Sequence, residues 1–510
     1  MLVIKNLSLY LSKDLRTLLE DFSFSLQPEH KVALIGEEGN GKSTLLKAIA
    51  NPSLINDYVE IKGEIFKDGE KIAYLPQILE GEILKKTTSD YLYNNVDFEQ
   101  FDYNLFYELI RQMDFPEERI SCSITLGQLS GGEKIKFQLL CEMMKSPTLL
   151  LLDEPSNDLD LKSVEWLEKF IKDIDIPIMF VSHDEILLEN CANTIIHFEQ
   201  LMRKSKPQYT IASLSYSEYV KNRDDNIVRQ TQLAKKEKAE YDSKMERYRQ
   251  IYERVQHELR SVSRQAPGVA KNLKDKMHSV KSMGRRFERE KENMTQNPDF
   301  EDSILVKFRD NISIPNGKQI LDFHLDTLEV GNNVLSQNIH LSIYGPKKIC
   351  IVGKNGAGKT TLLRLIGEEL KKNSIPIGYM PQDYSEMMNP KENAIEFLSK
   401  DSTKEENTRI RTYLGSVNFT KEEMFHPVEG LSGGQRAKLY FSKMILEKSE
   451  VLILDEPTRN LSPLSGPEVR GALKNFAGCI IAISHDRKFI EEVFDEVYEL
   501  DENGLFPINS

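Results

Sequence analysis

Apolar and polar positions follow the same order in the two halves of the chain. Continuous apolar runs at residues 148–152 and 451–454 have the character of strands that are buried on both faces of a sheet. Shorter β-rich runs lie upstream, at 22–26 and 31–35 in one half and at 339–343 and 348–352 in the other. A glycine-rich loop and a helix with apolar periodicity follow them. The pattern predicts an α/β fold with a mostly parallel sheet in each half.

The period changes to that of a helix in the middle of the chain. Apolar side chains recur there at spacings of four and three, at Tyr241, Met245, Tyr248, Tyr252, Val255, Leu259 and Val262. Beyond the turn signal Ala266-Pro267-Gly268 a similar rhythm returns at Leu273, Met277, Val280, Gly284, Phe287 and Met294. We expect two long antiparallel helices forming a coiled coil, with a tip near residues 260–272. The aromatic stripe fits the seam between them better than a platform for bases.

Charge sets this middle stretch apart. The whole chain has 67 Lys and Arg against 80 Asp and Glu, yet residues 201–298 hold 23 basic and 13 acidic residues. No acid lies between Glu258 and Asp275, and four basic residues crowd around the predicted tip: Arg260, Arg264, Lys271 and Lys274. A solvated helical face would explain some of this charge, but a basic segment between two acidic bodies favours binding of a polyanion.

Length and composition narrow the class of protein. A chain of 510 residues is long enough for about two to four domains. Its apolar runs are far shorter than the ~18 residues that span a bilayer, and its first residues read as a strand, so we expect a cytoplasmic protein with no membrane segment. The five cysteines are scattered without metal-ligand spacing, which favours buried reduced thiols.

Several short motifs occur twice in the same order, which indicates an internal repeat. Ser130, Glu154 and His183 recur 302 residues later, as Ser432, Glu456 and His485. Lys42 recurs as Lys359 and Gln77 as Gln382, so the segment after the first glycine-rich loop is 12 residues longer in the first copy. We expect that excess in a surface loop. The predicted domains are 1–200, a helical linker at 201–299, and 300–510, with an added hairpin at 304–323.

The glycine-rich loops match the phosphate-binding loop. Gly36, Gly39, Gly41, Lys42 and Ser43 form the first match, and Gly353, Gly356, Gly358, Lys359 and Thr360 form the second. Backbone N–H groups of such a loop surround a phosphate, and the helix that follows, which includes Thr44 or Thr361, directs its positive end to the same charge. The lysine neutralises phosphate oxygens and the hydroxyl reaches Mg²⁺. The sequence therefore predicts ATP and Mg²⁺ as ligands.

Two acidic pairs, Asp153-Glu154 and Asp455-Glu456, end the buried strands. That position places them beside the phosphates, at the carboxyl edge of the sheet. Asp153 and Asp455 suit Mg²⁺, while Glu154 and Glu456 are placed to orient or deprotonate an attacking water. An acidic pair after a strand is often only the start of a loop, but the pairing with a phosphate loop in both copies favours catalysis.

The motif Leu-Ser-Gly-Gly at 129–132 and 431–434 lies 24 residues before the glutamate and 53 before the histidine in both copies. With it the sequence resembles the ATP-binding cassette ATPases. The resemblance implies Gln77 and Gln382 as Mg²⁺ ligands of the Q-loops and His183 and His485 as switch histidines. It implies head-to-tail packing, in which each nucleotide lies between the phosphate loop of one copy and the signature motif of the other. The signature residues are Ser130, Gly132, Ser432 and Gly434.

Some positions depart from that pattern. Glu38 stands where the family usually has Asn, and an acid beside phosphates is unfavourable unless it points away. After Glu456 the chain lacks the aspartate that Asp160 supplies in the first copy. Tyr10 is the candidate for stacking on adenine, whereas Leu328 is the residue in its register in the second copy. These differences predict unequal hydrolysis at the two sites.

Tandem cassettes joined by a basic helical linker resemble the ABC-F translation factors. That resemblance implies a monomer that enters the ribosomal E site in its ATP-bound state, with the linker reaching 23S rRNA and the P-site tRNA. The long linker and the absence of a large insertion between Gln77 and Ser130 resemble the antibiotic-resistance, ribosome-protecting branch, which acts on lincosamides, pleuromutilins and streptogramin A. The alternatives are a housekeeping ABC-F factor, the ATPase subunit of a membrane transporter, and a DNA-handling ATPase.

Overall fold

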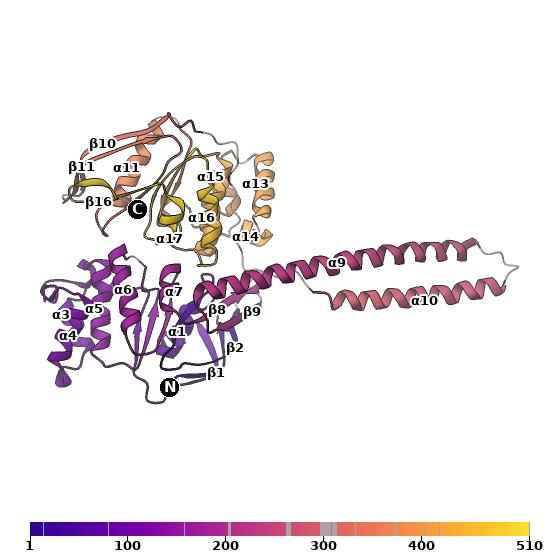
Figure 1. Ribbon diagram of the computed structural model, residues 1–510, viewed down its shortest axis with the longest axis horizontal. Helices are drawn as coiled ribbons and strands as arrows, with labels where there is room; N and C mark the ends of the chain where they lie inside the picture. The colour runs from indigo at the N-terminus through magenta and orange to yellow at the C-terminus, as the bar shows by residue number, and fades with distance from the viewer. Residues whose placement is uncertain are drawn as a thin grey trace. The chain divides into compact units, whose positions relative to one another are not determined.

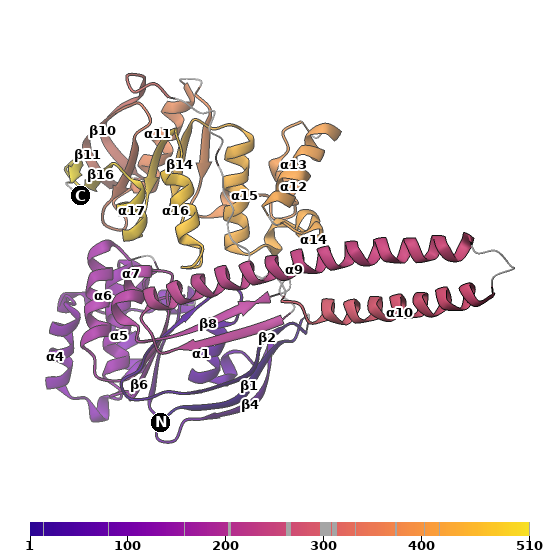
Figure 2. The same cartoon turned by 45° about the vertical axis from the view of Figure 1, so that its right-hand side comes forward.

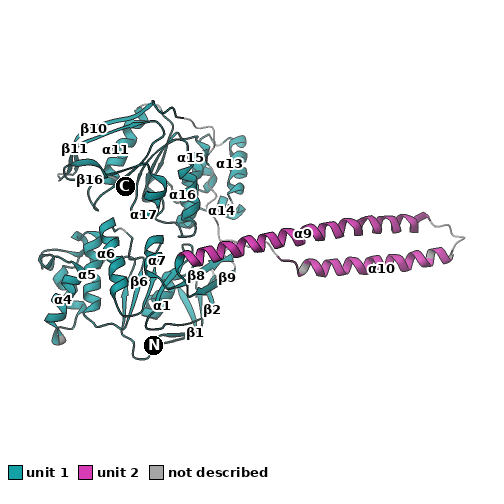
Figure 3. Ribbon diagram, viewed as in Figure 1, with its two compact units in different colours: residues 1–216, 301–510 teal, residues 217–300 magenta. Residues whose placement is uncertain are grey.

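The computed structural model describes residues 1–13, 15–79, 81–157, 159–201, 206–261, 267–295, 308, 314–331, 333–372, 375–401, 403–417 and 419–508. They form two compact units (Figure 3). One unit comprises residues 1–216 and 301–510 and contains both copies of the repeat. The other unit is the helical segment 217–300.

The first copy is built on a six-stranded sheet in the order β5-β6-β7-β3-β8-β9, which is parallel except for β9. Figure 2 labels two of these strands, β6 and β8. The strands of this sheet are β3 (Lys31–Ile35), β5 (Ile72–Leu75), β6 (Leu149–Asp153), β7 (Ile178–Val181), β8 (Thr194–Gln200) and β9 (Lys206–Ala212). An antiparallel sheet comprises β1 (Val3–Leu11), β2 (Thr17–Ser25) and β4 (Val59–Phe66). The main helices are α1 (Lys42–Ala50), α3 (Thr88–Asn95), α4 (Tyr103–Met113), α5 (Gly131–Met143), α6 (Leu161–Asp173) and α7 (Glu185–Cys191).

The second copy repeats this plan in the order β13-β14-β15-β12-β16-β17. Its strands are β12 (Lys348–Val352), β13 (Ile377–Met380), β14 (Val451–Asp455), β15 (Cys479–Ile483), β16 (Glu496–Asp501) and β17 (Gly504–Ile508). A hairpin is formed by β10 (Gln319–Val330) and β11 (Asn333–Tyr344). The helices are α11 (Lys359–Lys372), α12 (Ala394–Leu398), α13 (Lys404–Ser416), α14 (Lys421–Phe425), α15 (Gly433–Leu446), α16 (Gly466–Lys474) and α17 (Arg487–Val493). The predicted α/β fold with two repeated domains is therefore confirmed.

Two expectations about the sheets need correction. The extra residues of the first copy are not a surface loop, since they include β4, which pairs with β1 as a third strand. The predicted linker began at residue 201, but β9 (Lys206–Ala212) pairs with β8 in the first sheet and the helical unit begins at Ser217. Of the hairpin expected at 304–323, residues 304–307 and 309–313 lie outside the described residues. Of that stretch, β10 begins at Gln319.

The helical unit contains α9 (Tyr216–Ser261) and α10 (Pro267–Glu292), which run antiparallel as predicted (Figure 1). Val255, Leu273, Val280 and Phe287 are buried in this unit. Tyr248 meets the edge of the Phe287 ring with centroids 6.0 Å apart, so the aromatic stripe is a seam.

Candidate nucleotide sites

Each phosphate loop connects the central strand of its sheet to a helix. Gly36 follows β3, and a Cβ there would lie 2.2 Å from the carbonyl oxygen of Phe198, so only glycine fits. Lys42 opens α1, and its Nζ donates hydrogen bonds to the carbonyls of Gly36 and Glu37, at 2.7 and 2.9 Å. Lys359 repeats this arrangement at Gly353 and Lys354, at 2.7 and 3.0 Å. The same backbone cradle is thus built twice.

Oxygen groups suited to Mg²⁺ gather beside the first loop. The Ser43 hydroxyl donates to Asp153 Oδ1 at 2.7 Å, and the Tyr74 hydroxyl donates to Oδ2 at 3.2 Å. Gln77 lines the adjoining cavity. Burial raises the pKa of Asp153, an effect that the Ser43 hydrogen bond partly offsets. Hydroxyl, carboxylate and amide oxygens are the ligands that Mg²⁺ takes in proteins, so these residues fit that ion.

Glu154 pairs closely with His183. The distance between His183 Nε2 and Glu154 Oε1 is 2.8 Å, and Glu154 is buried. Burial alone would raise the pKa of Glu154, but the charge and hydrogen bond of His183 hold it below its ordinary value. The other oxygen, Oε2, is buried and has no hydrogen-bond partner in the described protein. Glu154 has a left-handed backbone with φ of 51°, a strained conformation typical of functional positions.

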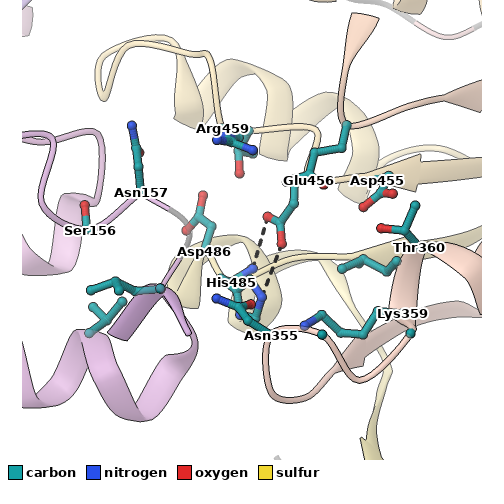
Figure 4. Close-up of a pocket in the computed structure, with 18 of the residues that line it drawn as sticks. Ser156, Asn157, Asn355, Lys359, Thr360, Asp455, Glu456, Arg459, His485 and Asp486 are labelled. Atoms are coloured by element: carbon teal, nitrogen blue, oxygen red, sulfur yellow. Dashed lines mark hydrogen bonds and ion pairs between the residues drawn. The ribbon is translucent and has the colours of Figure 1, made fainter. Parts of the chain in front are cut away.

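The equivalent pair in the second copy is looser (Figure 4). His485 Nε2 lies 3.6 Å from Glu456 Oε1, while the His485 backbone N–H donates to Oε2 at 3.2 Å. Burial raises the pKa of Glu456 to about 8. Burial, with the nearby charge of Lys359, lowers the pKa of His485 to about 4. Glu456 thus favours the protonated form at neutral pH, whereas Glu154 favours the ionised form.

Both cavities draw their walls from the two copies. A cavity of about 570 Å³ is lined by Gly131 and Lys134 of the first copy. Its walls in the second copy include Gly356, Gly358, Lys359, Thr360, Thr361, Gln382, Asp455, Glu456 and His485. A cavity of about 340 Å³ is lined by Gly39, Gly41, Lys42, Ser43, Thr44, Gln77, Glu154 and His183 of the first copy, with Arg459 and Asn460 of the second. The loop of one copy therefore faces the other copy at both sites.

The signature motifs cap helices α5 and α15. The Ser130 hydroxyl accepts the Glu133 N–H at the start of α5, and Ser432 does the same for Gln435 at α15. Neither serine is among the residues that line the cavities, and neither is Gly132 or Gly434. Their neighbours Gly131 and Lys134, which belong to α5, line the cavity of about 570 Å³.

The acid that departs from the family pattern makes a contact between the copies. The Glu38 carboxylate accepts the backbone N–H of Gly433 at the start of α15. Next to it, Glu37 Oε1 accepts the Ser465 hydroxyl at 3.0 Å. Glu38 thus lines the cavity beside its own loop and points toward the positive end of the opposite signature helix. The second loop has Lys354 and Asn355 at the matching positions.

The prediction that Tyr10 stacks on adenine is not supported by its position. Tyr10 does not line the cavity of about 340 Å³ beside the first phosphate loop, and the Lys62 ammonium lies over the Tyr10 ring, 4.9 Å from its centroid. Neighbours along a strand face opposite sides, and Leu11, the next residue, lines the cavity instead. Strand pairing also corrects the register of Leu328. Leu328 pairs with Ser336 in the second copy, and Leu9 pairs with Leu19 at the equivalent position of the first copy. Leu328 therefore corresponds to Leu9 and not to Tyr10.

Sequence reasoning missed four cationic residues that line the cavities or join the two copies. Arg16 donates to the Gly39 carbonyl, and Arg459 lines both cavities. Arg470 Nη1 lies 2.5 Å from Glu185 Oε1, with both side chains buried. Arg487 contacts Asp184 at 3.3 Å, which connects the loops that carry the two histidines. An isolated arginine carries no sequence signal for such a role, although Arg459 lies in the stretch that departs from the family pattern.

The basic residues of the predicted tip belong to the helical unit. Arg260, Lys271 and Lys274 are solvent-exposed. Arg264 lies outside the described residues. Among the described helices, none is both long and apolar enough to cross a membrane.

The model of the family described as "ABC transporter" matches this chain twice, at residues 19–157 and 336–459, which together make up just over half of its length. The chain belongs to the ABC transporter family. This family assignment covers both phosphate loops, both acidic pairs and both signature motifs, and it establishes the two copies as ATP-binding cassettes with the ATPase fold.

Relatives of similar layout extend the comparison. The chain is 28% identical to the ribosome protection protein VmlR of Bacillus subtilis, over 96% of this chain and 85% of the relative. It is 26% identical to ABC transporter F family member 5 of Arabidopsis thaliana, over 96% and 73%. Among solved structures, the archaeal ribosome recycling factor aABCE1 matches with a TM-score of 0.58 at 15% identity, over 99% of this chain and 90% of that one. The predicted resemblance to the F group of ABC proteins is confirmed.

Proposed function

We propose that this protein is an ATP-driven clamp that binds the ribosome. The ATP-closed form enters the E site, the basic helical hairpin reaches 23S rRNA and the P-site tRNA, and hydrolysis releases the protein. The observation that carries this proposal is the pair of cavities whose walls come from both cassettes, together with a linker of opposite charge to the cassettes. The name of the VmlR relative supports the choice of the ribosome as the partner.

The chemistry follows from the residues around each cavity. Lys42 and Lys359 neutralise phosphate oxygens, while Ser43, Gln77 and Asp153, with Thr360, Gln382 and Asp455 in the other cassette, hold Mg²⁺. When bound, Mg²⁺ neutralises charge on the phosphates. Glu154 and Glu456 orient the attacking water, and His183 and His485 hold these carboxylates in place. ADP and phosphate are the products.

Closure depends on the γ-phosphate because the opposite cassette supplies part of each site. Helix α15, which is capped by Ser432 and has Gly434 in its first turn, offers its positive end to the nucleotide of the first loop. Helix α5, with Ser130 and Gly132, does the same for the nucleotide of the second loop. Loss of the γ-phosphate removes the charge that holds these helices against the opposite loops. Hydrolysis then opens the clamp.

At the finer level we propose a cytoplasmic monomer that protects the peptidyl-transferase centre from lincosamides, pleuromutilins and streptogramin A. A housekeeping translation factor would use the same clamp. An antibiotic susceptibility panel on cells that express the protein separates the two roles, because only the first role raises the inhibitory concentration of these drugs.

The linker half of the proposal is tested by removing charge at its tip. The triple variant Arg260→Gln, Lys271→Gln, Lys274→Gln should pellet less with ribosomes in ATP. The slope of log K for ribosome binding against log salt concentration should become shallower by about one for each lost phosphate contact. The ATPase activity of the isolated protein should stay close to that of the wild type, since these residues lie in the other unit.

The matched control removes three exposed lysines of α9 outside the predicted tip, Lys235, Lys236 and Lys238. It should bind more tightly than the tip variant. Equal weakening by both variants would show that net charge, rather than the tip, governs binding. Displacement of the wild type from ribosomes by duplex DNA would favour the DNA-handling alternative.

A further inference from the structure

A cluster of potential metal ligands lies on the hairpin of the second cassette, outside both nucleotide cavities. His324 of β10 pairs directly with His340 of β11, and Asp322 pairs with Ser342 one step along the same face. The three residues Asp322, His324 and His340 offer ligand atoms that all lie within 4.8 Å of one another. Two imidazoles and a carboxylate are the donor set of many zinc sites.

The distances between ligand atoms suit a single ion. His324 Nε2 and His340 Nε2 lie 3.4 and 3.6 Å from the same oxygen, Asp322 Oδ1. Ligands about 2.0–2.1 Å from a tetrahedral zinc ion are separated by about 3.4 Å. The side chains therefore need only small movements to reach coordinating positions. The two imidazole rings are stacked with centroids 4.1 Å apart, so each must turn about its χ2 angle, and at such exposed positions this turn costs little.

The backbone under the cluster is firmly held, and the carboxylate has a supporting partner. The alternate residues Leu321, Phe323, Leu341 and Ile343 are buried in the core, which fixes the register of the two strands. The Ser342 hydroxyl donates to Asp322 Oδ1 at 2.7 Å and lies 3.2 Å from His340 Nε2. Such an outer partner orients a metal-ligating carboxylate.

The first cassette offers an internal comparison. Its corresponding strands pair Val3 with Ser25 where the second cassette pairs Asp322 with Ser342. Continuing along the same face, the first cassette has Lys5 and Ser23 in place of the two histidines. The repeat therefore does not require these ligands for folding, and their presence on one copy alone is unexplained by the cassette fold.

We propose that Asp322, His324 and His340 bind one divalent transition metal ion of the zinc class, with a fourth position open to water or to a ligand from a partner. Imidazole nitrogen favours such an ion over Mg²⁺. The ion links β10 to β11, and the far end of this hairpin supplies Val330 and Leu335 to the second nucleotide cavity. Metal binding would thus stiffen one wall of that cavity.

Calorimetric titration with Zn²⁺ tests the site directly. The full chain is used without a polyhistidine tag, in excess Mg²⁺ to saturate oxygen sites, and with Cys122→Ser, because Cys122 is exposed. This protein should bind one more equivalent of Zn²⁺ than the same protein with His340→Ala or Asp322→Asn. Because loss of an outer partner alone lowers metal affinity about 10- to 100-fold, Ser342→Ala should lose about tenfold, and each ligand variant should lose more than that.

Circular dichroism should show that the variants keep the wild-type fold, since all the substituted residues are exposed except Ser342, which is half-buried. A second readout is the melting temperature, which Zn²⁺ should raise in the parent protein but not in the ligand variants. Titrations that coincide for the parent, His340→Ala and Asp322→Asn would overturn the proposal, whether or not zinc binds elsewhere.

Discussion

At the scale of single residues, the two nucleotide sites are unlike. Glu154 is held 2.8 Å from His183 with a lowered pKa, whereas Glu456 has a raised pKa and a longer contact to His485. The first loop also carries Glu38, whose carboxylate accepts a hydrogen bond from the opposite signature helix. These contacts give a physical basis for unequal behaviour of the two sites.

Glu38→Asn should tighten ATP binding at the first site. The substitution removes an anion from the positive end of α15, where the nucleotide would otherwise compete with it, and the gain should be about fivefold, or ~1 kcal/mol. Titration with a fluorescent ATP analogue measures the affinity in a Lys359→Ala background, which silences the second loop. The reciprocal change, Asn355→Glu in a Lys42→Ala background, should weaken binding. Unchanged affinity of Glu38→Asn would show that its carboxylate does not compete with nucleotide.

The raised pKa of Glu456 predicts a pH dependence of stability in the nucleotide-free, Mg²⁺-free protein. Above the ordinary carboxyl pKa the unfolded chain releases this proton, while the folded protein retains it up to about pH 8, so stability falls as the pH rises through that window. Glu456→Gln cannot ionise and should escape this loss. The melting temperature of Glu456→Gln minus that of the wild type should therefore increase as the pH rises from 5 to 8.

The matched control for that experiment is Glu154→Gln. Because the pKa of Glu154 is lowered, the wild type should not lose stability relative to this variant over the same range. An equal increase in melting temperature relative to the wild type for both variants would mean that the two carboxyl groups titrate alike.

At the scale of elements, the hairpin of α9 and α10 depends on one close approach. A Cβ on Gly284 would lie 2.6 Å from the Tyr248 hydroxyl, so the glycine lets the tyrosine pack across the seam. Nearby, Lys244 and Glu290 form an ion pair at 3.1 Å between the two helices. The position of Gly284 in an otherwise apolar stripe is explained by this contact.

Gly284→Val should loosen the hairpin, because its side chain displaces Tyr248. Hydrogen exchange of backbone amides should accelerate, by about tenfold, in the parts of α9 and α10 near this contact, while the cassettes keep wild-type rates. The control is Gly268→Val near the start of α10, where a Cβ meets no atom of the described residues within 4 Å. Equal acceleration by both variants would point to helix propensity rather than packing as the cause.

Strong local patterns predicted most elements correctly. The buried strands β6 and β14, the two phosphate loops and the helical seam all follow from residue periodicity or motif spacing. The third strand β4 was missed although Val59 to Lys62 alternate, because Gly63 interrupts the pattern and the role of the strand depends on pairing with β1. Tyr10 does not line the cavity for a related reason, since the face that a strand residue presents depends on pairing register. Contacts between the cassettes, such as Arg470 with Glu185, join residues 285 apart and carry no local signal.

At the scale of the whole molecule, the two cassettes share ion pairs, one of them buried, as well as nucleotide cavities. Arg470 and Glu185 are both nearly inaccessible to solvent, and Arg487 bridges to Glu168 at 2.9 Å and to Asp184. Buried pairs of this kind tie specific partners together, since removing one member leaves an uncompensated charge. These contacts adjoin the loops of both histidines.

In the function proposed for this protein, ATP closes the cassettes on the ribosome and hydrolysis releases them. The most direct measurement is sedimentation of the double variant Glu154→Gln, Glu456→Gln with ribosomes in ATP and in ADP. Without the two carboxylates, turnover should fall by about 100-fold or more while ATP still binds. The variant should therefore pellet with ribosomes in ATP, remain in the supernatant in ADP, and inhibit translation. If it stays in the supernatant in ATP although it binds the nucleotide, the account is contradicted.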